Sequence, residues 1–121
     1  MKETVVVLGA SPKEDRYSYK AVALLKENGH TVIPVHPKAQ TVAEIPVVAQ
    51  LTSITTAIDT VSVYVNPYLL AQAADDIVKL KPKRVILNPG TESKELEERF
   101  TENGIEVCQA CTLVLLKTGQ F

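Results

Sequence analysis

The chain has 121 residues, of which 45% are hydrophobic and 22% charged, and these values predict one globular domain over residues 1–121. Thirteen lysines and arginines nearly balance 14 aspartates and glutamates, which leaves a formal net charge of -1. A surface so close to neutral has no general attraction for nucleic acid or for anionic membranes, so neither is expected as a partner.

The first predicted element is a buried strand at residues 5–8, where four apolar residues stand together before Gly9. A polar loop follows and runs through Arg16. Apolar residues then recur on one helical face across residues 21–25, and Asn28-Gly29 ends the pattern. The segment therefore predicts a strand, a glycine turn and a helix, which is the order of a nucleotide-binding βα unit.

Two β-branched runs predict the next strands, at residues 31–35 and 61–65, and a proline-containing pair closes each of them. Between these strands, residues 38–59 carry no long helical periodicity. Only residues 45–48 indicate a short edge strand there. We therefore expect most of this segment to be a loop.

A helix start is the clearest local signal in the second half of the chain. Asn66 suits the N-cap and Pro67 the first helical position, so we expect a helix from here to about Lys81. Residues 84–87 then predict a fourth strand, and residues 93–100 a further helix. Strands and helices thus continue to alternate.

Residues 105–108 predict a fifth strand, whereas the apolar run at residues 113–116 is too short to be assigned to a helix or a strand. The alternation predicts a Rossmann-like three-layer α/β fold, with a five-stranded parallel sheet and helices on both faces. We expect the strand order 3-2-1-4-5, numbered along the chain. No repeat or linker indicates a domain boundary.

The amino-terminal apolar run is too short for a signal peptide and lacks a cleavage site, and no stretch approaches 18 apolar residues. We therefore expect a cytoplasmic protein. The two cysteines, Cys108 and Cys111, form a C-x-x-C pattern that could indicate a redox pair or half of a zinc site. Other soft ligands are lacking nearby, so buried thiols without redox or metal chemistry are favoured. No metal is expected.

In an open parallel sheet, ligands bind at the carboxyl ends of the strands, where the first loop is the most informative. Gly9 allows close approach of a ligand, Ser11 offers a hydroxyl and Arg16 a planar cation. With the N–H groups of the following helix, these residues could form a diphosphate cradle. Alternatively, Gly9 makes only the strand-to-helix turn and Arg16 is a solvated charge.

The loop lacks the G-x-G-x-x-G fingerprint of dinucleotide sites, and no acidic residue follows the second strand to bind a ribose, which disfavours NAD. Lys38 stands there instead and suits a phosphate, either the 2′-phosphate of NADP or the 3′-phosphate of coenzyme A. We interpret His36 as a turn residue without a catalytic duty. No G-x-S-x-G elbow indicates a nucleophilic hydrolase, and no catalytic residue is assigned.

Four segments together resemble the small stand-alone CoA-binding proteins, whose domain is similar to that of the succinyl-CoA synthetase α subunit. These segments are VVVLGASPKEDRYSY, VIPVHPK, DTVSV and LNPG. The resemblance implies that the first loop and the start of its helix hold the CoA diphosphate. The residues that would do so are Gly9, Ala10, Ser11, Arg16, Ser18 and Tyr19.

The same resemblance implies that Pro37 and Lys38 flank the adenosine end. We further expect Asn66 and Pro67 to line the opposite wall of the site. The chain departs from the family pattern at three places. Asn66 stands near where an arginine is frequent, Ala43 replaces a common glycine, and Gln109-Ala110-Cys111 replaces an Asp-Arg-Cys-like ending.

The expected function is non-catalytic binding of coenzyme A or an acyl-CoA through the first strand-to-helix loop. One alternative is an NADP-binding subunit of a small oxidoreductase, which would need a partner chain for its substrate domain. Another is a regulatory or scaffold protein whose nucleotide site has decayed. A non-enzyme is favoured over an enzyme, with a small nucleotide ligand as partner and a homo-oligomer or protein complex as open options.

Overall fold

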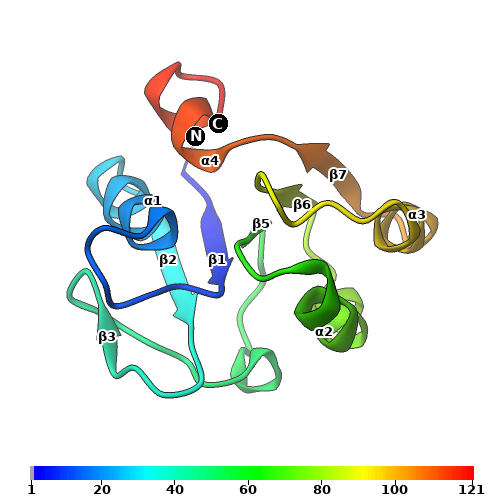
Figure 1. Cartoon of the computed structure of the whole chain (residues 1–121), viewed down its shortest axis with the longest axis horizontal. Coiled ribbons are helices and arrows are strands. Elements are labelled where there is room, and N and C mark those ends of the chain that lie inside the picture. The colour runs from blue at the N-terminus through cyan, green and yellow to red at the C-terminus, as the bar shows by residue number, and fades with distance from the viewer. Residues whose placement is uncertain (1) are drawn as a thin grey trace.

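Strands and helices alternate through residues 2–121, the part of the chain that the computed structural model describes (Figure 1). Five parallel strands form one sheet: β1 (Thr4–Leu8), β2 (Thr31–Val35), β5 (Thr60–Val63), β6 (Arg84–Leu87) and β7 (Glu106–Gln109). The helices that flank it are α1 (Tyr17–Glu27), α2 (Pro67–Leu80), α3 (Lys94–Glu102) and α4 (Thr112–Lys117). The predicted α/β fold with five parallel strands is therefore confirmed. Within the described residues, no helix has the length and hydropathy needed to span a bilayer.

Both faces of the sheet are buried, because α1 and α4 cover one face and α2 and α3 the other (Figure 1). On β1, Val6 and Leu8 pack into the core beneath α2 and α3, while Val5 and Val7 pack into the core beneath α1. This alternation follows from the two-residue period of a strand. A sheet covered on both sides explains why its strands appear in the sequence as unbroken apolar runs.

The predicted strand order was wrong. The sheet runs β2-β1-β5-β6-β7, which is 2-1-3-4-5 when its strands are numbered along the chain, whereas 3-2-1-4-5 was expected. β1 pairs with β2 on one side, with Val6 opposite Ile33, and with β5 on the other, with Val6 opposite Val61. The third strand therefore lies in the middle of the sheet, and the chain reverses its direction of winding after β2.

Pro34 explains why β2 is an edge strand of the sheet. Proline has no N–H to donate, so within sheets it is confined to edge strands and bulges. In β2, the carbonyl of Pro34 points outward and accepts from the N–H of Val48 (2.9 Å), which forms only an isolated bridge beside Val35. By contrast, all four residues of β5 are buried, as an interior strand requires.

The segment at residues 38–59 contains more structure than expected. A small hairpin joins β3 (Thr41–Val42) to β4 (Ile45–Pro46), and a 3-10 turn, η1 (Leu51–Ser53), follows. The two turn residues of the hairpin, Ala43 and Glu44, both have positive φ (50° and 67°), which is the conformation of a tight type I′ turn. The short predicted strand at 45–48 is thus β4, and the unassigned run at 113–116 belongs to α4.

A polar cluster ties the amino-terminal ends of the strands to the end of the chain. The Glu3 carboxylate accepts hydrogen bonds from the Thr60 hydroxyl (2.6 Å) and from the guanidinium of Arg84 (3.3 Å). Phe121 covers Arg84, with the guanidinium carbon 4.5 Å from the ring centroid, and also packs against His30. Both ends of the described chain therefore lie at the amino-terminal ends of the strands (Figure 1).

His30 makes this cluster sensitive to pH. Its Nδ1 accepts the backbone N–H of Glu3 (3.0 Å), and burial lowers the pKa of His30 below its ordinary value of 6.5, an effect that Glu3 partly opposes and the cations Lys2 and Arg84 reinforce. The folded state favours the neutral form of His30, so this residue makes its full contribution to the free energy of unfolding above pH 6.5. That contribution is lost as the pH falls through the lower pKa that His30 has in the folded state.

We expect the free energy of unfolding to fall between pH 7 and pH 5, and the fall to be smaller in His30→Asn, which keeps a hydrogen-bond acceptor without a charge. Urea unfolding at each pH measures this. The carboxyl of Asp59 also has a lowered pKa, mainly because it accepts the N–H of Thr4, but from an ordinary value of 3.8 it loses its contribution only in more acidic solution. If the free energy of unfolding falls as steeply with pH in His30→Asn as in the parent protein, His30 is not the group responsible.

Candidate functional site

The loop after β1 turns sharply at Gly9. Its φ is +87°, and a Cβ at this position would lie 2.7 Å from Cγ1 of Val65 and 3.2 Å from the backbone of Tyr64. An L-residue is therefore excluded both by conformation and by space. Glycine allows the β1–α1 loop to pass directly over the end of β5, which places the loop at the middle of the sheet.

The backbone donors of this loop are already used within the protein. The N–H groups of Gly9 and Ala10 both donate to the carbonyl of Val35 (3.2 Å each), and the N–H of Ser11 donates to the hydroxyl of Ser18 (3.1 Å). A diphosphate could accept these three N–H groups only if they left the acceptors that they have in this structure. These bonds fix the loop against β2 and α1 instead.

Backbone N–H groups without an acceptor lie at the start of α1, which follows the loop. Among the described residues, the N–H groups of Tyr17, Ser18 and Tyr19 have no acceptor, and the N-cap residue Arg16 provides no side-chain cap. The first turn of α1 also contains no acidic residue. An uncapped helix start with a cation beside it favours a bound anion.

A cavity of about 580 Å³ opens in front of this helix start, and we call it the loop cavity. It is bounded by the β1–α1 loop and by the carboxyl ends of β2, β5 and β6. Its lining residues are Gly9, Ala10, Ser11, Pro12, Lys13, Arg16, Tyr17, Ser18, His36, Tyr64 and Pro89. The two cations at positions 13 and 16 and no carboxylate line it, so its electrostatics favour a phosphate.

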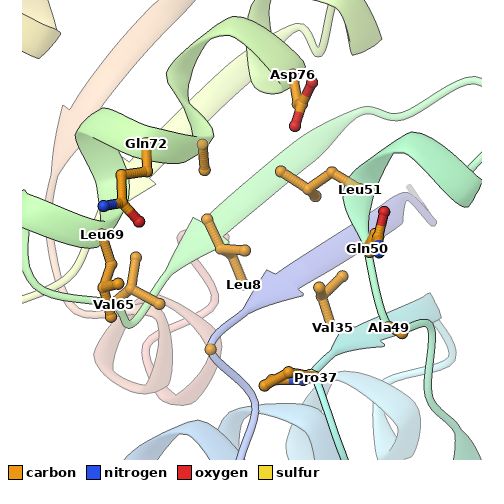
Figure 2. A pocket seen from close by; sticks show the side chains of 12 residues that line it. Leu8, Val35, Pro37, Ala49, Gln50, Leu51, Val65, Leu69, Gln72 and Asp76 are labelled. Carbon is orange, nitrogen blue, oxygen red and sulfur yellow. The ribbon is translucent and has the colours of Figure 1, made fainter.

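A second cavity, of about 390 Å³, lies on the other side of Gly9 between β2 and α2, and we call it the β2–α2 cavity (Figure 2). Apolar side chains including Leu8, Val35 and Leu51 form much of its lining. Gln72 and Asp76 enter it from α2, one turn apart. An apolar surface with a few polar groups is typical of a site for a flat base and its sugar.

The third cavity, of about 480 Å³, lies beneath α4, and we call it the α4 cavity. Its lining residues are Tyr17, Tyr64, Asn88, Pro89, Cys111, Leu113, Val114 and Lys117. Three of these, Tyr17, Tyr64 and Pro89, also line the loop cavity, so the two cavities adjoin. The three cavities therefore follow one another along the carboxyl edge of the sheet.

A buried polar network lies beneath the α4 cavity. The side-chain amide of Asn88 donates to the Ser62 hydroxyl (3.0 Å) and to the carbonyl of Val63 (2.9 Å), while its oxygen accepts the N–H of Thr112 (2.8 Å). The hydroxyls of Ser62 and Thr112 lie 2.8 Å apart and share a hydrogen bond. One asparagine thus fastens the start of α4 to β5 and β6.

Tyr64 stands between this network and the cavities. Its hydroxyl oxygen is buried and makes no hydrogen bond of normal geometry, although the Ser62 and Thr112 hydroxyls are close. Burial raises the pKa of Tyr64 to about 12, and the nearby Cys111 adds to this rise. The hydroxyl therefore remains a protonated donor at neutral pH.

The structure distributes the predicted site residues unevenly. Gly9, Ala10, Ser11, Arg16 and Ser18 line the loop cavity, whereas Pro37 lines the β2–α2 cavity. None of the described cavities is lined by Lys38, Asn66 or Pro67, and Tyr19 faces a groove between α1 and α4 on the far side of α1.

Two of the remaining residues have structural contacts that explain their placement. Asn66 caps α2, because its side-chain oxygen accepts the N–H of Leu69 (2.9 Å), as the sequence predicted. His36 closes the turn after β2, since its Nδ1 accepts the N–H groups of Lys38 (3.0 Å) and Ala39 (2.8 Å). The interpretation of His36 as a turn residue agrees with these bonds.

Sequence reasoning missed Tyr17, Tyr64, Gln72 and Asp76. Helical spacing could have found the last two, because Leu69, Gln72 and Asp76 recur at intervals of three and four residues and so share one face of α2. The two cysteines are both free thiols, and the described residues contain no cluster of three or more potential metal ligands.

Comparisons with known proteins show what the whole chain is similar to. Residues 3–117 match the model of a family described as a CoA binding domain. A crystal structure of an uncharacterized protein is 44% identical, with a TM-score of 0.95, and the match covers 100% of this chain and 99% of that one. The search of curated proteins found no match.

Two further solved structures extend the likeness. A protein from Thermus thermophilus, designated cell-free ID.343, is 29% identical with a TM-score of 0.89, over 99% of this chain and 91% of that one. A dinucleotide-forming acetyl-coenzyme A synthetase from Ca. Korarchaeum cryptofilum, in complex with phosphate and ADP, is 20% identical with a TM-score of 0.75. That match covers 89% of this chain but 25% of the synthetase, and it shows a shared fold alone.

Proposed function

The chain belongs to the family of CoA binding domains, and from this premise we propose that it binds coenzyme A or an acyl-CoA at the carboxyl edge of its sheet, without catalysing a reaction. The observation that carries this proposal is the uncapped start of α1 beside Arg16, which opens into the loop cavity. A diphosphate is the part of the ligand that suits these donors best.

The strand order supports the same location. In a 2-1-3-4-5 sheet, the connections that leave neighbouring strands 1 and 3 run to opposite faces, and ligands bind in the crevice at this switch point. Here the switch lies between β1 and β5, where Gly9 meets Val65. The loop cavity and the β2–α2 cavity lie on either side of that point, so one ligand can occupy both.

We assign the adenosine to the β2–α2 cavity. Its apolar lining suits a base, and the side chains of Gln72 and Asp76 can bind ribose hydroxyls or an exocyclic amine. The diphosphate then crosses Gly9 to reach Arg16 and the first-turn N–H groups of α1. Pro37 also lines this cavity, which supports placing the adenosine on this side of Gly9.

Arg16→Ala is expected to weaken CoA binding about 10- to 100-fold, because a charge-assisted hydrogen bond to phosphate contributes about 1.5–3 kcal/mol. Calorimetric titration with CoA and with ADP measures the loss. Lys26→Ala is the matched control, since it removes one positive charge from the other end of the same helix, where the side chain is exposed. Equal affinity of Arg16→Ala and the parent protein would remove Arg16 from the site.

Titration of the parent protein with CoA, acetyl-CoA, NAD and NADP tests the ligand itself. A saturating CoA species, at 100 times its dissociation constant, should stabilise the fold by about 2.7 kcal/mol and raise its melting temperature. Tighter binding of NADP than of either CoA species would favour the oxidoreductase-subunit alternative. No response to any of the four would favour a decayed site.

A further inference from the structure

His36 uses one ring nitrogen to close the turn after β2 and leaves the other nitrogen free. Its Nδ1 accepts the backbone N–H groups of Lys38 (3.0 Å) and Ala39 (2.8 Å), so Nδ1 carries no proton. In a neutral imidazole the proton is then on Nε2, because the hydrogen bonds of one ring nitrogen decide which nitrogen is protonated. The turn therefore fixes His36 in the form that donates through Nε2.

The free Nε2 of His36 belongs to a residue that lines the loop cavity. The residue is partly buried, and within residues 2–121 the hydrogen bonds of its ring are the two at Nδ1. Since Nε2 lies across the ring from Nδ1, its N–H is directed away from the turn. Lys13 and Arg16 line the same cavity. A neutral, directional donor thus stands in a cavity whose charge already favours a phosphate.

The place of His36 along the chain indicates which phosphate it reaches. His36 lines the loop cavity, to which we assign the diphosphate, whereas its neighbour Pro37 lines the β2–α2 cavity, to which we assign the adenosine. The two residues therefore stand at the boundary between the cavities. A nucleotide that crosses this boundary has its first phosphate, the one bonded to the ribose, beside His36.

We propose that His36 donates a hydrogen bond from Nε2 to the phosphate that is bonded to the ribose of the ligand. This inference rests on the proposed function, since it requires a nucleotide that extends across both cavities. The hydrogen bonds at Nδ1 hold the ring in place and keep its proton on the side of the ligand. The residue that closes the turn after β2 thus also recognises the ligand.

His36→Asn separates the two roles of His36. The Oδ1 of asparagine stands as many bonds from the backbone as Nδ1 and closes the same kind of turn, but the asparagine side chain ends one bond short of Nε2. In calorimetry, the affinities for AMP and for ADP should fall by the same factor, about tenfold, because each ligand loses one hydrogen bond to a charged oxygen. The midpoint of urea unfolding should stay unchanged.

The same substitution at the other histidine is the matched control. Nδ1 of His30 also accepts a backbone N–H, that of Glu3 (3.0 Å), but His30 precedes β2 and lies at the amino-terminal ends of the strands. At neutral pH, His30→Asn should therefore bind AMP and ADP as tightly as the parent protein does.

A second measurement needs no variant. Nitrogen NMR of the isotope-labelled parent protein reports which ring nitrogen of each histidine carries the proton. In mildly alkaline solution, where free imidazole is neutral, we expect Nε2 to carry it in both His30 and His36. On addition of ADP, the Nε2–H resonance of His36 should move and its exchange with water should slow, whereas the resonance of His30 should stay in place.

The outcomes distinguish this inference from the proposed function. If ADP binds, the inference is wrong when His36→Asn keeps the parent's affinity, when AMP does not bind or shows no loss, or when the His36 resonance ignores ADP. Should His36→Asn fail to fold, the resonances of the parent protein decide. If CoA, AMP and ADP all fail to bind the parent protein, the proposed function itself is wrong, and His36 has no ligand to contact.

Discussion

Asn88→Ala is expected to lower the free energy of unfolding by about 3–5 kcal/mol. Asn88 is 1% exposed, and its removal leaves the Thr112 N–H, the Val63 carbonyl and the Ser62 hydroxyl without one partner each. An unsatisfied buried polar group costs about 1–3 kcal/mol, and the members of a network do not act independently. The start of α4, with Cys111 beside it, should loosen as well.

Urea unfolding measures this change, with the slope of the transition checked for constancy. The matched control is Asn103→Ala, because Asn103 is exposed and its side-chain amide donates to one backbone carbonyl, that of Arg99. A loss at Asn88 no larger than the loss at Asn103 would mean that the network does not hold α4 to the sheet.

Gly9→Ala is expected to lower the free energy of unfolding by about 2–4 kcal/mol, the second large effect. Positive φ alone costs a non-glycine residue about 1–2 kcal/mol, and the new Cβ would also collide with Val65. Gly104→Ala measures the cost of positive φ alone, because the φ of Gly104 is +78° and nothing beyond its chain neighbours lies within 4 Å of the added Cβ.

The collision can be tested directly with Val65→Ala, which removes the Cγ1 atom that the new Cβ would approach. In this background, Gly9→Ala should cost less than in the parent protein, although the backbone of Tyr64 and Val65 remains close. Equal costs at Gly9 and Gly104 would refute close approach as the reason for glycine in this loop.

The sequence predicted those parts of the fold that depend on local pattern. Apolar runs located all five strands of the sheet, and the Asn66-Pro67 pair located the start of α2. Strand order is a different kind of property, because it depends on pairing between segments far apart in the chain. The proline within β2 did carry a signal, since a strand with Pro34 in it belongs at an edge.

The candidate site was predictable as a location but not in its atomic detail. Gly9 and Arg16 both line the loop cavity at the carboxyl ends of the strands. The hydrogen bonds from the Gly9 and Ala10 N–H groups to Val35 follow only from the contact of β1 with β2. Tyr17 and Tyr19 lie about 200° apart around an ideal helix, on nearly opposite faces. Which of the two lines the loop cavity therefore depends on how α1 packs against the sheet. The α4 cavity is formed by segments distant in sequence, which no local pattern reveals.

The polar cluster that contains Glu3, Arg84 and Phe121 also determines where the two ends of the chain emerge. Both emerge at the amino-terminal ends of the strands, whereas the loop cavity and the β2–α2 cavity open at the carboxyl ends. A fusion partner or an immobilising tether attached at either end therefore projects away from the ligand. The same separation means that this domain can be spliced into a larger polypeptide through both ends while its ligand remains free to enter and leave.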